Sequence, residues 1–167
     1  MKNIVEVFEI SALNGTARQK ALDFVREGFD YPWMTEVMNS LRAFVGLFGI
    51  KIKCCSLSGS WDRGFIQTDA ANEHFRGVKL SGFDREQMLT GFIMDSTLMY
   101  CFVDTFKQTG SAHKAFLSAL DAFVEDVRSD MDCHYSEESL IEATVGNELF
   151  FTKDGMFVGH HVQKIAA

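Results

Sequence analysis

Apolar residues recur at steps of three and four almost without interruption between Met88 and Phe106. This spacing follows the 3.6-residue period of an α-helix, and the apolar positions cover nearly the whole circumference of that helix. Asp84 is a suitable N-cap before the run, and Gly110 is a suitable stop after it. Because a helix that is apolar on almost all sides must be enclosed by other elements, we expect residues 84–110 to form a helix at the centre of the fold.

Shorter helical patterns flank this segment. Each combines an apolar stripe with a capping or terminating residue. They predict four helices. The first begins after a cap at Ser11 or Asn14 and ends near Gly28, and the second runs from Pro32 to Gly49. The third begins after a cap at Ser111, and the fourth is a short helix after Ser136.

Several short segments favour β-strands. Residues 3–10 form an imperfect strand pattern, residues 50–57 and 64–68 predict a hairpin, and residues 77–80 predict a short third strand. Asp154 and Gly155 between two apolar runs predict a second hairpin. With no linker or repeat in the sequence, we expect one α+β domain over residues 1–167, with a small antiparallel sheet packed against a bundle of four to five helices.

The composition is that of a globular protein. The 167 residues are 47% hydrophobic and 23% charged, and no apolar run is long enough to span a membrane. No secretory signal pattern precedes the first strand. Four cysteines without metal-binding spacing indicate reduced, mostly buried thiols, with Cys54 and Cys55 on opposite faces of a strand. We therefore expect a cytoplasmic protein that does not associate with membranes.

No motif indicates catalysis or a cofactor. The sequence contains neither a phosphate-binding glycine loop nor a dinucleotide-binding glycine pattern. Cys133, His134, His160 and His161 do not have the close paired spacing of zinc ligands, and the acids after Asp130 lack the glycine of a calcium loop. Cys101 lies within the apolar helix and is expected to pack there. We expect no catalytic residue, no metal and no cofactor.

The negative charge is concentrated in one stretch. Residues 111–150 contain nine acidic and two basic residues, a balance of −7 that equals the net charge of the whole chain. Asp121, Glu125 and Asp132 fall, with Arg128, on the face of the predicted helix opposite its apolar stripe, and further acids lie in the segment that follows. One interpretation is a solvated helix face. The other is a binding surface for a basic partner, formed by Asp121, Glu125, Asp126, Asp130, Asp132, Glu137 and Glu138.

The first seventy residues resemble small bacteriophage-encoded accessory proteins. The similarity lies in residues 8–23 (FEISALNGTARQKALD), in Trp33, in residues 49–52 (GIKI) and in the turn at residues 58–64 (SGSWDRG). Residues 65–68 (FIQT) depart from the acidic, glycine-rich run of those proteins, and the later acidic helices have no counterpart in them. The resemblance implies a phage accessory gene of the antitoxin-like or anti-defence kind, and analogy extends this to anti-CRISPR proteins.

The sequence therefore predicts a phage-derived, non-enzymatic inhibitor in the host cytoplasm. Its acids would take the place of nucleic-acid phosphates in the basic groove of a host protein or ribonucleoprotein defence complex, such as a CRISPR effector. With a net charge of −7, the chain is not expected to bind nucleic acid directly. Two alternatives remain: a small hydrolase or metal enzyme, and an antitoxin-type module that binds through Trp61, Phe65, Phe150, Phe151 and Phe157.

Overall fold

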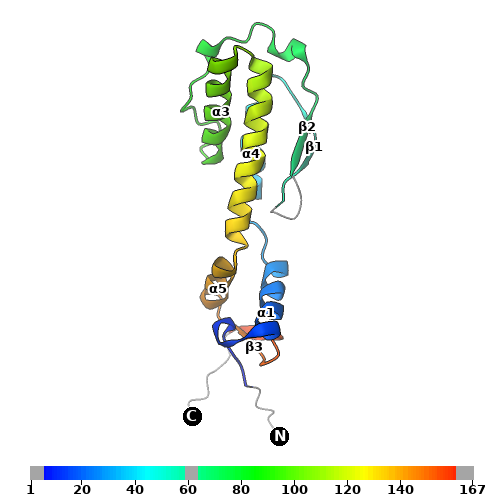
Figure 1. Cartoon of the computed structure of the whole chain (residues 1–167), viewed down its shortest axis with the longest axis vertical. Coiled ribbons are helices and arrows are strands. Elements are labelled where there is room, and N and C mark those ends of the chain that lie inside the picture. Colours follow the sequence, from blue (N-terminus) through cyan, green and yellow to red (C-terminus); the bar gives the residue numbers. More distant parts are fainter. Residues whose placement is uncertain (1–5, 59–63, 161–167) are drawn as a thin grey trace. The chain divides into compact units, whose positions relative to one another are not determined.

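The computed structural model describes residues 6–58 and 64–160 of the chain (Figure 1). These residues form helices, short 3-10 turns and two antiparallel hairpins, which confirms the predicted α+β class. The helices are α1 (Gly15–Gly28), α2 (Met34–Gly46), α3 (Met94–Thr109), α4 (Ala112–His134) and α5 (Glu137–Gly146). The strands are β1 (Ile52–Ser56), β2 (Phe65–Thr68), β3 (Leu149–Phe151) and β4 (Phe157–His160).

Contacts divide the chain into two compact units. Met1–Tyr31 and Cys133–Ala167 make up one, called here the terminal unit, and Pro32–Asp132 make up the other, the central unit. Each unit contains one of the hairpins, β3–β4 in the terminal unit and β1–β2 in the central unit. That the whole chain is a single domain stays a prediction.

In the terminal unit, α1 and α5 lie side by side (Figure 1) and enclose an apolar core. The core residues come from α1, α5, β3 and the chain before α1: Ile10, Leu13, Ala21, Leu22, Val25, Leu140, Leu149 and Phe151. The predicted strand at residues 3–10 is wrong for its described part. Phe8 makes a single bridge to Phe151, and Ile10–Ala12 then turns into a 3-10 helix. Residues 1–5 lie outside the described residues.

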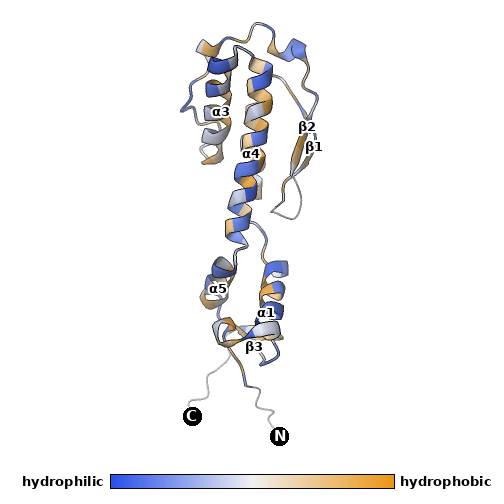
Figure 2. Cartoon of the chain, viewed as in Figure 1, coloured by the Kyte–Doolittle hydropathy of each residue, from blue (hydrophilic) through white to orange (hydrophobic). Residues whose placement is uncertain are grey.

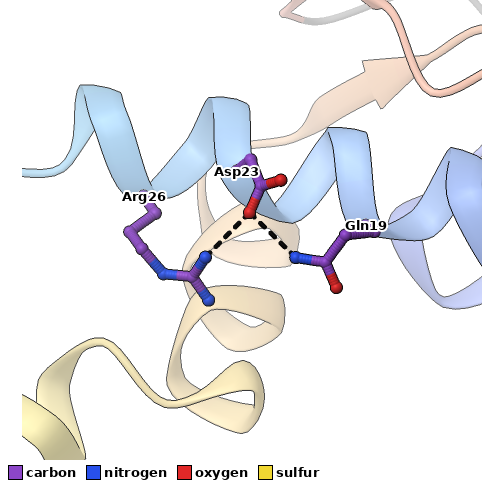
Figure 3. A network of polar contacts seen from close by, with 3 residues as sticks. All are labelled: Gln19, Asp23 and Arg26. Atoms are coloured by element: carbon purple, nitrogen blue, oxygen red, sulfur yellow. Dashed lines mark hydrogen bonds and ion pairs between the residues drawn. The ribbon is translucent and has the colours of Figure 1, made fainter. Parts of the chain in front are cut away.

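The exposed side of α1 satisfies its own charges. Asp23 Oδ1 accepts hydrogen bonds from Gln19 Nε2 and Arg26 Nη1, both at 2.8 Å (Figure 3). These residues are three and four positions away from Asp23, which places them next to it on the helix surface. This carboxylate is therefore already paired within its own helix.

In the central unit, phenylalanine rings join α2, α3 and α4. Phe44 stacks on Phe116 with ring centroids 5.6 Å apart, and Phe102 meets Phe44 edge-on at 5.9 Å. All three side chains are fully buried. Phe48 and Phe83 extend the cluster with a stacked pair at 5.6 Å. The apolar residues of α3 thus pack against two neighbouring helices, as expected for a helix whose apolar positions lie on several sides.

Helix α3 begins ten residues later than the sequence predicts. Asp84 caps only a local turn, in which its Oδ1 accepts from the Glu86 N–H. The fully buried carboxylate of Asp95 instead accepts the backbone N–H groups of Leu89, Thr90 and Gly91 at 2.6–3.0 Å. Gly91 has a φ of 89°, which is outside the right-handed helical region. The segment before Met94 is therefore a loop held by Asp95.

The β1–β2 hairpin is confirmed, but its details differ from the expected alternation. The register shifts between Ile52 and Cys54, so Cys54 is exposed and Cys55 is half-buried. Burial raises the pKa of the Cys55 thiol, and the neighbouring Cys54 raises it further. The expectation of mostly buried thiols is wrong, since Cys133 is exposed as well.

The third strand predicted at residues 77–80 is also wrong. The chain there passes from a turn at Gly77 into the 3-10 helix Leu80–Gly82. Among the described residues, no helix is both long and apolar enough to cross a membrane.

Candidate functional site

The structure places the seven predicted contact acids on two helices in two different units. Five lie on α4 within the central unit: Asp121, Glu125, Asp126, Asp130 and Asp132. Glu137 and Glu138 lie in the first turn of α5, in the terminal unit. All seven side chains are exposed. The five acids on α4 can therefore be considered together as one surface.

Helix α4 is amphipathic along its whole length. The Ser111 hydroxyl accepts the Lys114 N–H at its start, as the sequence predicts. Hydrophobic and hydrophilic residues alternate along the helix (Figure 2). The buried stripe of α4 consists of Ala112, Ala115, Phe116, Ala119, Leu120, Phe123, Val127 and Met131. This stripe fixes the rotation of the helix, so that charged residues between the apolar positions face outward.

The α4 acids form two stripes instead of one. At about 100° per residue, Asp121, Glu125 and Asp132 fall within about 40° of one another, opposite the buried stripe. Asp126 and Asp130 lie about 140° to 180° from Asp121, on the side of the helix that carries the buried stripe, although both side chains are exposed. We call the first set, Asp121, Glu125 and Asp132, the outer stripe.

Interactions within the chain further separate these acids. Glu125 pairs with Arg128 at 2.7 Å on the outer stripe. Asp126 accepts a short hydrogen bond from the Thr97 hydroxyl of α3. In the terminal unit, Glu137 pairs with Arg18 at 2.6 Å. On the outer stripe, three carboxylates and one arginine give a net charge of −2.

A groove lies beside the outer stripe, between α4 and β2. It has a volume of about 560 Å³ and is lined, among the described residues, by Gly64, Phe65, Ile66, Leu120, Asp121, Val124, Glu125 and Arg128. The sequence analysis did not predict this groove. Alternation in the hairpin indicated one buried face, but the pattern contained no information on which face of α4 the hairpin would approach.

Gly64 is the residue that allows this close approach. A Cβ atom at this position would lie 3.0 Å from Val124 Cγ1 and 3.1 Å from the Ser56 carbonyl oxygen. A side chain there would push the start of β2 away from α4. The absence of a side chain at Gly64 thus brings Phe65 next to the charged face of α4.

The residues of the antitoxin-like alternative are divided between the two units. Phe151 is fully buried in the core of the terminal unit, which contradicts its proposed role in contacting a partner. Phe150 and Phe157 are half-buried in the same unit, whereas Phe65 belongs to the central unit and is 48% exposed. Trp61 lies outside the described residues.

The histidines and cysteines do not assemble either. Within residues 6–58 and 64–160, no group of three or more His, Cys, Asp or Glu side chains is arranged to hold a metal ion. His134 contacts the rings of Tyr31 and Tyr135, and His160 contacts that of Phe157. His161 lies outside the described residues. Cys101 approaches the Ser118 hydroxyl at 3.4 Å between α3 and α4, in the packing position expected for it.

No protein-family model matches the chain, and no curated protein or solved structure shows significant similarity to it.

Proposed function

We propose that this chain is a non-enzymatic inhibitor that binds a basic surface of a nucleic-acid-handling complex through the carboxylates of α4. The observation that supports this best is the density of exposed acids on that helix. Between Asp121 and Asp132 there are five acidic residues and a single basic one, Arg128, and all five acids are exposed. Such a surface attracts a positively charged partner and accelerates its association.

The carboxylates of the outer stripe are spaced more widely than the phosphates of a nucleic-acid strand. The helix rises about 16 Å from Asp121 to Asp132, so these three carboxylates give about one negative charge per 8 Å of axis. One strand of duplex DNA has about one phosphate per 3.4 Å of axis. Carboxylates and phosphates nevertheless accept the same bidentate hydrogen bonds from arginine. A groove lined with arginine and lysine, as in a CRISPR effector, is the kind of partner surface that this helix would fit.

The division of the α4 acids into two stripes limits the proposed partner contact to one side of the helix. Since Asp126 is engaged by Thr97 at the α3 side, the outer stripe of Asp121, Glu125 and Asp132 would face the partner. Neutralising it removes three charges without touching the buried stripe of α4. The matched control neutralises Asp126 and Asp130, which changes two charges of the same helix on a different side.

The test is affinity capture from a bacterial lysate, with three baits: wild type, the outer-stripe variant D121N/E125Q/D132N and the control D126N/D130N. We expect wild type and the control to retain the same nucleic-acid-handling protein, and the outer-stripe variant to lose it. Mass spectrometry identifies the retained protein, and circular dichroism verifies that all three baits are folded.

Two further measurements distinguish phosphate mimicry from other binding. A single-stranded oligonucleotide should displace the partner from the wild-type bait, and added salt should weaken the wild-type complex more than any residual complex of the outer-stripe variant. Retention of the same partner by the folded outer-stripe variant would refute the proposal. So would a partner whose binding is insensitive to both oligonucleotide and salt.

A further inference from the structure

The groove between β2 and α4 is lined by both charged and apolar side chains. Leu120 and Val124 of α4 face Phe65 and Ile66 of β2 across it. The Phe65 ring is 48% exposed, although phenylalanine usually buries a large apolar area. This groove therefore offers an aromatic and aliphatic lining that a partner side chain can cover.

The carboxylates at the groove are not equivalent. Glu125 is held by Arg128 at 2.7 Å, so its charge is already partly neutralised. Asp121 also lines the groove, one helical turn before Glu125, and has no hydrogen-bond or ion-pair partner among the described residues. Arg128 lies seven residues beyond Asp121, about 10 Å along the helix axis. Asp121 is therefore the acceptor in this groove that is available to an incoming cation.

From this arrangement we infer that the groove receives an arginine side chain of the partner protein. Its aliphatic stem would pack against Leu120 and Val124, and its guanidinium would lie against the Phe65 ring and donate two hydrogen bonds to Asp121. This inference rests on the proposed function and adds to it a specific anchoring residue. The arginine is one that would otherwise hold a phosphate.

The chemistry of the lining favours arginine over lysine. A guanidinium is planar, stacks on aromatic rings and gives two parallel hydrogen bonds to one carboxylate. An ammonium is a compact, strongly hydrated charge that gains less from an apolar lining. Anionic side chains are repelled by Asp121 and Glu125, whose two charges exceed that of Arg128. A neutral side chain would cover the Asp121 carboxylate without pairing its charge.

The inference is tested with three capped tripeptides, Gly-Arg-Gly, Gly-Lys-Gly and Gly-citrulline-Gly. Citrulline has the shape of arginine without its charge. Each is titrated into ¹⁵N-labelled full-length protein and followed by two-dimensional NMR. We expect millimolar binding of the arginine peptide, weaker binding of the lysine peptide and least binding of the citrulline peptide. The shifted resonances should include Phe65, Ile66, Asp121 and Val124.

Two groove variants and one control variant locate the binding. D121N should weaken the affinity for the arginine peptide about fivefold to tenfold, as expected for the loss of a charge-assisted hydrogen-bonded pair. F65A should reduce the preference for arginine over lysine, because the stacking surface is removed. E86Q, which neutralises an exposed acid of the same unit away from the groove, should bind like wild type. A dispersed spectrum verifies folding for each variant.

Equal binding of the arginine and citrulline peptides would overturn the inference, as would shifts confined to residues outside the groove. Asp132 lies on the outer stripe but outside the groove. If D132N reduces the affinity for the arginine peptide as much as D121N does, the peptide binds by general charge attraction. In that case the groove is not the site, while the proposed function stands or falls separately on the capture experiment.

Discussion

Replacing Asp95 is expected to destabilise the central unit more than replacing any exposed acid. Its carboxylate is fully buried and accepts three backbone N–H groups, from Leu89, Thr90 and Gly91, at 2.6–3.0 Å. The Thr90 hydroxyl also contacts it at 3.1 Å and in turn contacts the Ser40 hydroxyl of α2 at 3.1 Å. Asp95 thus connects the loop before α3 to both α3 and α2.

The expected loss of stability follows from the backbone N–H groups that lose Asp95 as their acceptor. A hydrogen bond to a charged group contributes about 1.5–3 kcal/mol, and a buried donor without a partner costs about 1–3 kcal/mol. Because Thr90 and Gly91 are exposed, water replaces part of what is lost, and the lower ends of these ranges apply. We expect D95N to reduce the free energy of unfolding by about 2 kcal/mol and D95A by about 3 kcal/mol.

The effect should depend on pH in a defined direction. Burial raises the pKa of the Asp95 carboxyl, but hydrogen bonds from the Thr90 and Gly91 N–H groups and from the Ser40 and Thr90 hydroxyls together bring it below its usual value. A depressed folded-state pKa stabilises the fold above the unfolded-state pKa of about 3.9, and this contribution is lost as the pH falls through the folded-state value. The difference between wild type and D95N should therefore narrow below about pH 4.

Urea unfolding followed by tryptophan fluorescence measures this directly, because Trp33 lies in the central unit and neither of the two tryptophans falls within the residue ranges of the terminal unit. The control is D84N, since Asp84 accepts a single backbone N–H at the surface, and a loss below about 1 kcal/mol is expected. A D95N protein as stable as wild type at pH 7 would contradict this account. A difference from wild type that is the same at pH 7 and pH 3 would contradict it as well.

Two further changes test the cores of the units. F44A should destabilise the central unit by about 3–5 kcal/mol in urea unfolding, because it removes a fully buried ring that stacks on Phe116 and meets Phe102 edge-on. L47A, at a side chain that is 43% exposed, should cost less than about 1 kcal/mol. Gly155 has a φ of +80°, and a Cβ there would lie 2.0 Å from the Ala17 carbonyl oxygen. G155A should therefore increase amide hydrogen exchange throughout the terminal unit, whereas G146A, whose Cβ would meet no atom within 4 Å, should not.

Helices were largely predictable because their signals are local. The caps at Ser111 and Ser136 and the stop at Gly110 lie where the pattern places them. The same is true of the hairpin turn at residues 154–155, where Gly155 adopts the positive φ that the turn requires. In each case one side chain, or its absence, determines the backbone conformation within three residues.

Where prediction failed, a residue further along the chain decided the outcome. Asp84 and the apolar residues after it form a complete helical pattern, but the Asp95 carboxylate competes for the N–H groups at residues 89–91. Capping statistics give no reason to prefer the later acid, because both are aspartates ahead of apolar residues. The burial of Asp95 against α2 decides between them, and that depends on tertiary packing.

The candidate site was predictable in composition but not in shape. Counting charges identified α4, and the helical period separates Asp121 and Glu125 from Asp126 without any coordinates. The sequence analysis counted these acids as one surface and so missed the second stripe. The groove required Gly64 to be recognised as a contact point between β2 and α4, and a glycine beside a strand is more often explained by a turn.

The packing of α4 keeps its acidic residues at the surface. Its buried stripe holds Phe116 and Phe123 in the core of the central unit, so the helix cannot rotate to hide its acids. Like charges four residues apart on a helix, as at Asp121 and Glu125, destabilise it by a few tenths of a kcal/mol. A chain selected for stability alone would place a lysine or arginine at residue 121, where it would face Glu125. An aspartate at that position, next to an exposed phenylalanine, fits the proposal that a partner supplies a cationic side chain there.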